Sequence, residues 1–119
     1  MVREIVASAP GKVNLHLGVG EARTDGYHDL VSVFHAVDRR EVVRLLLDGA
    51  PVAGPAVASM RTTFFVDEPD EDIDGPNNLA WRAVEAVVSR AGVAVPRVRI
   101  EVDKHVFVAG GMAGGSADA

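Results

Sequence analysis

Apolar and polar residues alternate along several short stretches of the chain, which is the pattern of β-strands. The clearest case is 97–104, where Val98, Ile100 and Val102 alternate with charged residues, so this stretch is predicted to be a strand with one buried face. Alternation or short apolar runs predict further strands over 4–9, 13–19, 30–37, 41–47 and 61–66.

Two of these predicted strands, 4–9 and 13–19, are separated by Ala9-Pro10-Gly11, which has the composition of a turn. Within 13–19 the apolar positions alternate with polar ones or glycine, so we expect a half-buried strand with one polar face that is available for function. The polar segment 21–28 contains Asp25-Gly26, a turn signal, and should connect this strand to the next.

A helical period begins after residue 78. Apolar residues from Leu79 to Ala91 fall on one helical face, Asn78 supplies a start signal and Gly92 a stop signal. Residues 48–59 are expected to be a surface connection and 67–74 an acidic loop. The glycine-rich run at 110–119 should open a second helix. Strands, a helix, a further strand and this loop together predict an α+β fold.

Composition narrows the class of protein. The chain has 119 residues, 48% hydrophobic residues, a formal net charge of −5 and no cysteine. This is enough for one small globular domain with a core, and it excludes a disulfide framework, a thiolate metal site and a cysteine nucleophile. The acidic balance argues against a broad nucleic-acid surface. The first residues lack a signal pattern and no apolar run is long enough to span a membrane, so we expect a soluble protein of the cytoplasm.

The glycine-rich segment 108–118 is the strongest candidate for chemistry. Consecutive glycines let backbone N–H groups converge, and the start of a following helix would add a partial positive charge, so the segment could cradle a phosphate. Ser116 could contact a phosphate oxygen or a metal-bound water. The run matches neither the Walker pattern nor Gly-x-Gly-x-x-Gly. A flexible glycine loop or tail fits the same residues equally well.

Lys12 and the pair Tyr27-His28 could each take part in chemistry, but each also has a simpler structural interpretation. Lys12, one of only two lysines, stands where a strand is predicted to begin and could stabilise an anionic substrate or a developing oxyanion, although a solvated surface lysine is commoner. Tyr27 beside His28 could stack on a base and bind its edge, or the tyrosine could simply pack over a hairpin. Asn78 is expected to be a helix cap that could also lie beside a nucleotide.

Together these segments resemble the GHMP kinase superfamily, and within it the branch that phosphorylates CDP-methylerythritol. The matching pieces are Ala9-Pro10-Gly11-Lys12-Val13-Asn14-Leu15, Arg23-Thr24-Asp25-Gly26-Tyr27-His28, Asn78-Leu79 and residues 108–119. They occur in the family's order over nearly the whole chain, and the first two separate this branch from its relatives.

The resemblance implies ATP-dependent phosphorylation of the 2-hydroxyl of CDP-methylerythritol, in the non-mevalonate route to isoprenoid precursors, with ATP and Mg²⁺. Lys12 would be the catalytic lysine, and Asn14, Tyr27 and His28 would bind the substrate. Ser116 is the possible ligand of Mg²⁺. The residues implied to bind ATP are Asn78, Lys104, Phe107, Val108, Ala109, Gly110, Gly111, Met112, Ala113, Gly114, Gly115, Ser116 and Ala117.

This chain departs from the family in two respects. Phe107 stands where the family usually has proline. The family is also more than twice as long, and its catalytic aspartate lies beyond the glycine-rich loop; Asp118 belongs to the loop motif and does not replace it. We therefore expect residues 1–119 to be an incomplete N-terminal ATP-binding domain without the C-terminal substrate domain, inactive alone. A GHMP kinase for another small alcohol and a non-catalytic nucleotide-binding module are the alternatives.

Overall fold

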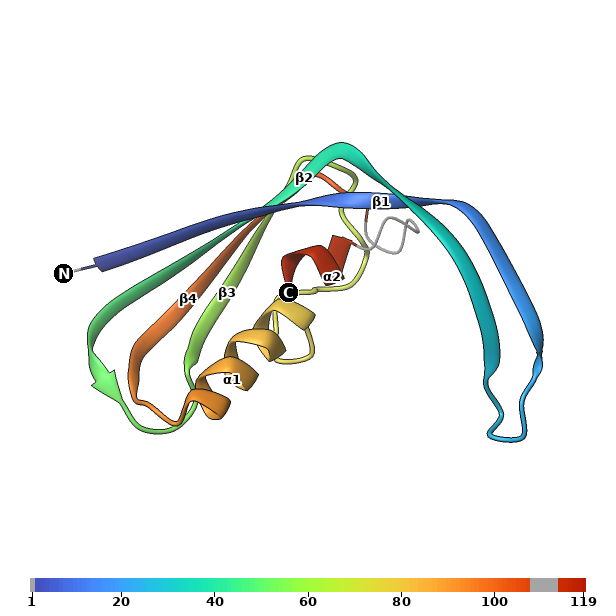
Figure 1. Cartoon of the computed structure of the whole chain (residues 1–119). Coiled ribbons are helices and arrows are strands. Elements are labelled where there is room, and N and C mark those ends of the chain that lie inside the picture. Colours follow the sequence, from blue (N-terminus) through green and yellow to red (C-terminus); the bar gives the residue numbers. More distant parts are fainter. Residues whose placement is uncertain (1, 108–113) are drawn as a thin grey trace.

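The computed structural model describes residues 2–107 and 114–119 of the chain. In chain order the elements are β1 (Val2–Ala22), β2 (His28–Val52), β3 (Val57–Phe64), α1 (Leu79–Ala91), β4 (Val95–Lys104) and α2 (Gly114–Asp118). The strands form one sheet in the order β1-β2-β4-β3, in which only β3 and β4 are parallel. Both helices lie on the same face of this sheet (Figure 1). The predicted α+β fold is confirmed.

The predicted turn at Ala9-Pro10-Gly11 is wrong, because β1 is a single strand of 21 residues. The register between β1 and β2 shifts between Pro10 and Lys12 instead. Proline lacks an N–H donor, which an edge strand tolerates at an irregularity, and β1 is one of the two edge strands. The turn-like composition therefore encodes a β-bulge. In the same way, the predicted strands 30–37 and 41–47 are parts of one strand, the 25-residue β2.

Residues 12–36 form a two-stranded arm that extends past the rest of the sheet. Here β1 and β2 pair with each other, whereas β4 pairs with β2 only from Val42 to Val52. The arm bends toward the side on which the helices lie (Figure 1). The expectation of a half-buried strand over 13–19 is wrong: Leu15, Leu17 and Val19 are 65%, 52% and 61% exposed, because none of the described elements packs over the arm.

The core lies between β4, its neighbouring strands and α1. Val98, Ile100 and Val102 of β4 are buried together with Val57 of β3, as their alternation predicts. Partly buried residues of β2, β3 and α1 pack against them: Val43, Leu45, Leu47, Met60, Trp81 and Val84. The sequence pattern thus identified the central strand of this core correctly.

Both predicted ends of α1 are confirmed. The Oδ1 atom of Asn78 accepts a hydrogen bond from the N–H of Ala80 at 2.9 Å, and Gly92 ends the helix in the left-handed conformation with φ of 67°. The predicted acidic loop 67–74 contains neither helix nor strand, and it is fixed to β3 because the Asp74 carboxylate accepts hydrogen bonds from the N–H and hydroxyl of Thr62.

Among the described helices, none is long and apolar enough to cross a membrane.

Candidate functional site

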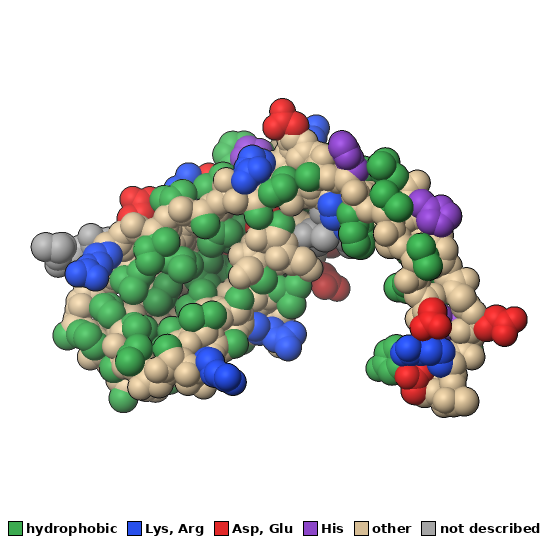
Figure 2. Space-filling model, in the orientation of Figure 1, with side chains coloured by type: hydrophobic (Ala, Val, Ile, Leu, Met, Phe, Trp, Pro, Cys, Tyr) green, Lys and Arg blue, Asp and Glu red, His purple; other side chains and the backbone are tan. Residues whose placement is uncertain are grey.

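A wide hollow separates the bent arm from the helical side of the sheet (Figure 2). The residues that the sequence suggested for function fall on three parts of the molecule around it. These are the base of the arm with Lys12 and Asn14, the tip of the arm with Tyr27 and His28, and the region where β4 leads toward α2. The fold therefore distributes the predicted site over segments that the arm's bend turns toward one another.

At the base of the arm, the structure brings Lys12 and Asn14 together. The Nζ atom of Lys12 donates a hydrogen bond to Oδ1 of Asn14 at 3.3 Å and lies 5.3 Å from the ring centre of Phe34. Asn14 pairs with Phe34 across the strands, so these three side chains belong to one face of the arm. The residue as a whole is half-buried, whereas its hydrogen bond to Asn14 is exposed.

At the tip of the arm, a hairpin turn presents Tyr27 to solvent. The turn is held by Gly26 at φ of 85° and by the Asp25 carboxylate, which accepts a hydrogen bond from the N–H of Tyr27 at 3.0 Å. The tyrosine is 71% exposed, so the simpler interpretation, in which it packs over the hairpin, is wrong.

His28 is oriented by the backbone of the opposite strand. Its Nδ1 atom lies 2.8 Å from the carbonyl oxygen of Gly20. Since a carbonyl only accepts hydrogen bonds, Nδ1 must carry the proton, and in the neutral ring Nε2 is then an acceptor. The hydrogen bond to Gly20 therefore orients the imidazole of His28, the residue that follows Tyr27 in the chain.

Lys104, at the end of β4, is buried. Its Nζ atom donates a hydrogen bond to Oδ2 of Asp118 at 2.7 Å and lies 3.7 Å from Oε2 of Glu41. Only 3% of the residue is exposed. The described contacts of this ammonium group are thus with two carboxylates of the same chain. Because the group is buried, any effect of Lys104 on ATP would be indirect.

The glycine-rich segment is only partly described. Phe107 is 44% exposed, with the guanidinium of Arg39 5.9 Å from its ring centre. Gly114, Gly115, Ser116 and Ala117 belong to α2, where the side chain of Ser116 is exposed. The expectations for Val108, Ala109, Gly110, Gly111, Met112 and Ala113 lie outside the described residues.

Sequence reasoning missed the part played by Glu41. This residue is 1% exposed, and its Oε1 atom accepts a hydrogen bond from the N–H of Val106 at 2.7 Å. Burial, together with the nearby charge of Asp118, raises the pKa of Glu41 to about 7, against the opposing effects of Lys104 and the Val106 N–H. The sequence did contain one signal of this burial: Glu41 alternates with Val43 and Leu45, so the three residues lie on the same face of the strand.

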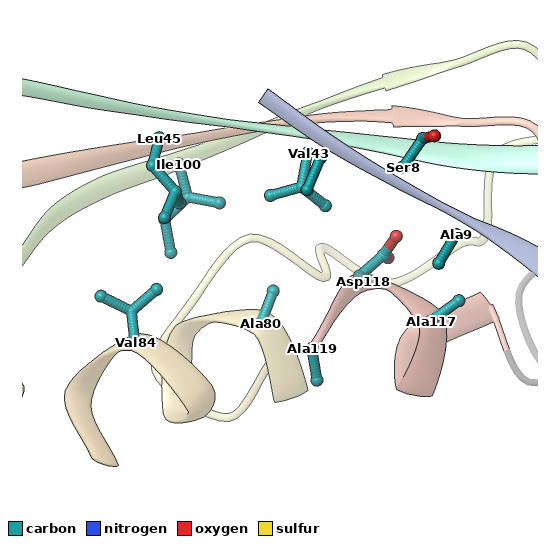
Figure 3. A pocket seen from close by; sticks show the side chains of 11 residues that line it. Ser8, Ala9, Val43, Leu45, Ala80, Val84, Ile100, Ala117, Asp118 and Ala119 are labelled. Carbon is teal, nitrogen blue, oxygen red and sulfur yellow. The ribbon is translucent and has the colours of Figure 1, made fainter. Parts of the chain in front are cut away.

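An apolar cavity of about 200 Å³ lies between the sheet and the two helices (Figure 3). It is separate from Lys12 and Tyr27, and Asp118 supplies its charged side chain, which points from α2 toward the sheet. The residues around it are Ala7, Ser8, Ala9, Val43, Leu45, Ala80, Val84, Ile100, Ala117, Asp118 and Ala119. The cavity belongs to the core and not to the predicted substrate site.

Comparisons with known proteins point to one enzyme. No protein-family model matches the chain. Relatives from Corynebacterium efficiens, Mycolicibacterium smegmatis and Saccharopolyspora erythraea are 48%, 47% and 44% identical to it over 97% of the chain, and each is named 4-diphosphocytidyl-2-C-methyl-D-erythritol kinase.

The fold gives the same result. A crystal structure of 4-(cytidine 5'-diphospho)-2C-methyl-D-erythritol kinase superimposes with a TM-score of 0.66 at 33% identity, covering 97% of this chain and 37% of that one. The chain likewise spans 37%, 33% and 34% of the lengths of the three relatives. Over nearly its whole length, the chain is therefore similar to 4-diphosphocytidyl-2-C-methyl-D-erythritol kinases, and it spans about a third of their length.

Proposed function

We propose that the protein to which this segment belongs transfers the γ-phosphoryl group of ATP to the 2-hydroxyl of CDP-methylerythritol, in the synthesis of isoprenoid precursors. The observation that carries the proposal is the 48% identity, over 97% of the chain, to a relative named for this reaction. Such an enzyme would work in the cytoplasm, and residues 1–119 would be the N-terminal, ATP-binding part of it.

Lys12 is assigned the catalytic role at the base of the arm. Phosphoryl transfer depends mainly on positioning and on stabilisation of charge, and an ammonium group is a compact positive charge for the attacking oxygen or the transferred group. The contact between Lys12 and Asn14 supports this assignment, because it holds the ammonium group on one face of the arm. Asn14 would in turn help to position the substrate.

Tyr27 and His28 are assigned to the cytidine. An exposed aromatic ring offers a face on which a base can stack, and Nε2 of His28 is an acceptor of fixed orientation. The strand from Lys12 to Ala22 measures roughly 30 Å along its path, and the bend of the arm shortens the direct separation of tip and base (Figure 1). An extended nucleoside diphosphate derivative is the kind of ligand that suits two such separated contacts.

ATP is assigned to the glycine-rich segment, with Asn78 and Lys104 near it. Mg²⁺ would neutralise charge on the phosphates. Among the described residues there is no cluster of three histidine or carboxylate ligands for a metal, but Mg²⁺ in kinases is held largely by phosphates and water with few protein ligands. The exposed hydroxyl of Ser116 is one suitable oxygen, so the described residues fit a metal brought in with ATP.

Asp118 is not assigned the role of general base. Its carboxylate is buried and forms an ion pair with Lys104 at 2.7 Å, so it cannot reach a substrate hydroxyl in this arrangement. The resemblance described above implies a catalytic aspartate beyond the glycine-rich loop, so for residues 1–119 alone we expect turnover to be lower by about 10²–10⁴-fold or absent.

The proposal is tested with the product of the complete reading frame, assayed with ATP, Mg²⁺ and CDP-methylerythritol. Lys12→Met is expected to lower kcat by at least about 100-fold, whereas Tyr27→Ala should mainly raise the KM for CDP-methylerythritol. Arg3→Met, which removes an exposed charge from the part of β1 outside the arm, is the control. Turnover of a small alcohol that cytidine nucleotides do not inhibit would favour a different GHMP kinase, and ATP binding without any turnover would favour a non-catalytic module.

A further inference from the structure

Three charged side chains from three elements are buried together beside the glycine-rich segment. Glu41 of β2, Lys104 of β4 and Asp118 of α2 are 1%, 3% and 8% exposed. Charged residues are almost never buried to this extent unless they are paired. We call this group the buried brace. The chemistry assigned above to Lys12, Tyr27 and His28 does not account for this group.

The brace connects the two ends of the glycine-rich segment. On the side that follows β4, Oε1 of Glu41 accepts the hydrogen bond from the N–H of Val106 at 2.7 Å. On the other side, Nζ of Lys104 binds Oδ2 of Asp118 in α2 at 2.7 Å. Since Lys104 also lies 3.7 Å from Oε2 of Glu41, the two anchoring contacts meet at one ammonium group.

Gly114, the first residue of α2, shows how closely the two ends approach. A Cβ atom on Gly114 would lie 3.2 Å from Cβ and Cγ1 of Val106 and 3.3 Å from Nζ of Lys104. These distances are shorter than ordinary van der Waals contacts, so the close approach depends on the absence of a side chain. The start of α2 is therefore packed directly on the residues that the brace holds.

The charges of the brace balance only if one carboxyl group is neutral. Two carboxylates face one ammonium group, and Oε2 of Glu41 and Oδ1 of Asp118 are buried without a hydrogen-bond partner among the described residues. A proton on Glu41 would turn one of these acceptors into a donor to the other. The raised pKa of Glu41 agrees with this arrangement. An uncompensated buried charge is costly, so removal of one member affects the others.

We propose that Glu41, Lys104 and Asp118 are positioning residues that hold Val106 and the start of α2 in a fixed relation, and that ATP binding depends on this relation. The effect on ATP binding rests on the proposed function. The mechanical role, in which the three residues hold the two ends of the segment, does not. By this account Lys104 acts on ATP through the segment and not by direct contact.

The first test is hydrogen exchange of the 119-residue chain, comparing Lys104→Met with a matched control. Arg44→Met breaks the ion pair with Asp103, which also joins β2 to β4 at 2.7 Å but is only partly buried. With Lys104→Met, amides of 105–107 and 114–118 should exchange at least ten-fold faster, and those of α1 less than two-fold faster. Equal effects of the two variants, or uniform acceleration along the chain, would overturn the proposal.

If Lys104→Met does not fold, a second pair of variants at Glu41 tests the same proposal. Glu41→Gln retains an oxygen acceptor for the Val106 N–H, whereas Glu41→Leu has a similar volume and no acceptor. We expect exchange at Val106 to stay within two-fold of the original with Gln and to rise at least ten-fold with Leu. If Leu and Gln give the same rate, Glu41 does not anchor the segment.

The ATP part is measured by making the same variants in the product of the complete reading frame and titrating them with Mg-ATP. Lys104→Met and Glu41→Leu should weaken binding at least ten-fold, and Glu41→Gln should restore it to within two-fold. Faster exchange with unchanged ATP affinity would overturn the positioning role. If the unsubstituted chain shows no ATP binding although the exchange results are as expected, the assignment of ATP to the segment fails while the mechanical role of the brace is supported.

Discussion

Neighbouring residues of the same type have different surroundings at the start of α2. Gly114 lies against Val106 and Lys104, whereas the nearest atom to a Cβ on Gly115 would be Cδ1 of Leu79, at an ordinary 3.6 Å. The glycine-rich composition was visible in the sequence, but the sequence did not show which glycine needs its lack of a side chain for packing. That distinction depends on contacts between residues far apart in the chain, which composition does not encode.

Gly114→Ala is expected to lower the free energy of unfolding by about 1–3 kcal/mol, because the added methyl group overpacks a buried contact. Urea denaturation measures the change. Gly115→Ala is the matched control, and it should be neutral or slightly stabilising, since alanine is about 1 kcal/mol more favourable than glycine in a helix. A similar loss of stability in both variants would show that the contacts of Gly114 are not responsible.

Glu41 is expected to give the stability of the chain a pH dependence. Its pKa is 4.5 as an ordinary carboxyl and about 7 in the fold, so between these values the unfolded chain binds fewer protons than the folded chain. The free energy of unfolding should therefore fall as the pH rises from about 4.5 to 7. Glu85, whose pKa is lowered by hydrogen bonds from Val57 and Ala56, loses its contribution in the opposite direction, at more acidic pH.

The pH dependence is measured from urea midpoints at several pH values between 4.5 and 8, with Glu41→Gln as the comparison. The substitution should flatten the curve over this window, because a neutral amide takes the place of the titrating group. A curve of unchanged slope in Glu41→Gln would assign the pH dependence to another residue.

Among the elements, two strands with the same alternation have opposite burial. In β4 the apolar residues at alternate positions are buried, whereas in the arm they are exposed. Alternation shows that a strand has two chemically different faces, but whether a face is covered depends on tertiary packing. For this reason β4 and α1, whose apolar residues pack together, were predicted correctly, while the uncovered arm and its long continuous strands were not.

Substitutions in the two strands should differ accordingly. Ile100→Ala is expected to destabilise the chain by about 2–5 kcal/mol, because it leaves a cavity in the core. Leu17→Ala, at a residue that is 52% exposed, should change stability by less than about 0.5 kcal/mol. Thermal or urea unfolding of both variants tests this expectation, and a large loss from Leu17→Ala would mean that the arm face is covered in solution.

For the whole molecule, the arm makes the shape elongated, with extents of 52 × 36 × 25 Å. The sequence predicted most of the strand segments, helix α1 and a turn signal within 21–28, where the structure has a hairpin turn. It also suggested Lys12, Tyr27 and His28 as functional residues, from their residue types and from the matching motifs, and these assignments stay predictions. The contacts among Glu41, Lys104 and Asp118 could not be predicted, since they join β2, β4 and α2, which are distant in the sequence.

The exposed apolar residues of the arm should make the folded chain bind an apolar fluorescent dye, as contiguous apolar surface does. Leu17→Ser combined with Leu30→Ser is expected to reduce the dye signal at least about two-fold, because these residues are 52% and 63% exposed. Val87→Ser with Val93→Ser removes equally exposed residues outside the arm and is the control. Equal reductions in the two double variants would contradict the assignment of the dye site to the arm.

The register shift between Pro10 and Lys12 lies at the base of the arm. Beyond this point the arm is held by its own two strands, so the bend at its base sets where the tip lies. Over a length of roughly 30 Å, a change of about 10° in that bend would displace Tyr27 by about 5 Å. Under the proposed function, the span between the ligand contacts at Lys12 and Tyr27 would thus follow from the backbone geometry of the arm, where the register shifts between Pro10 and Lys12 and again between Asn14 and His16.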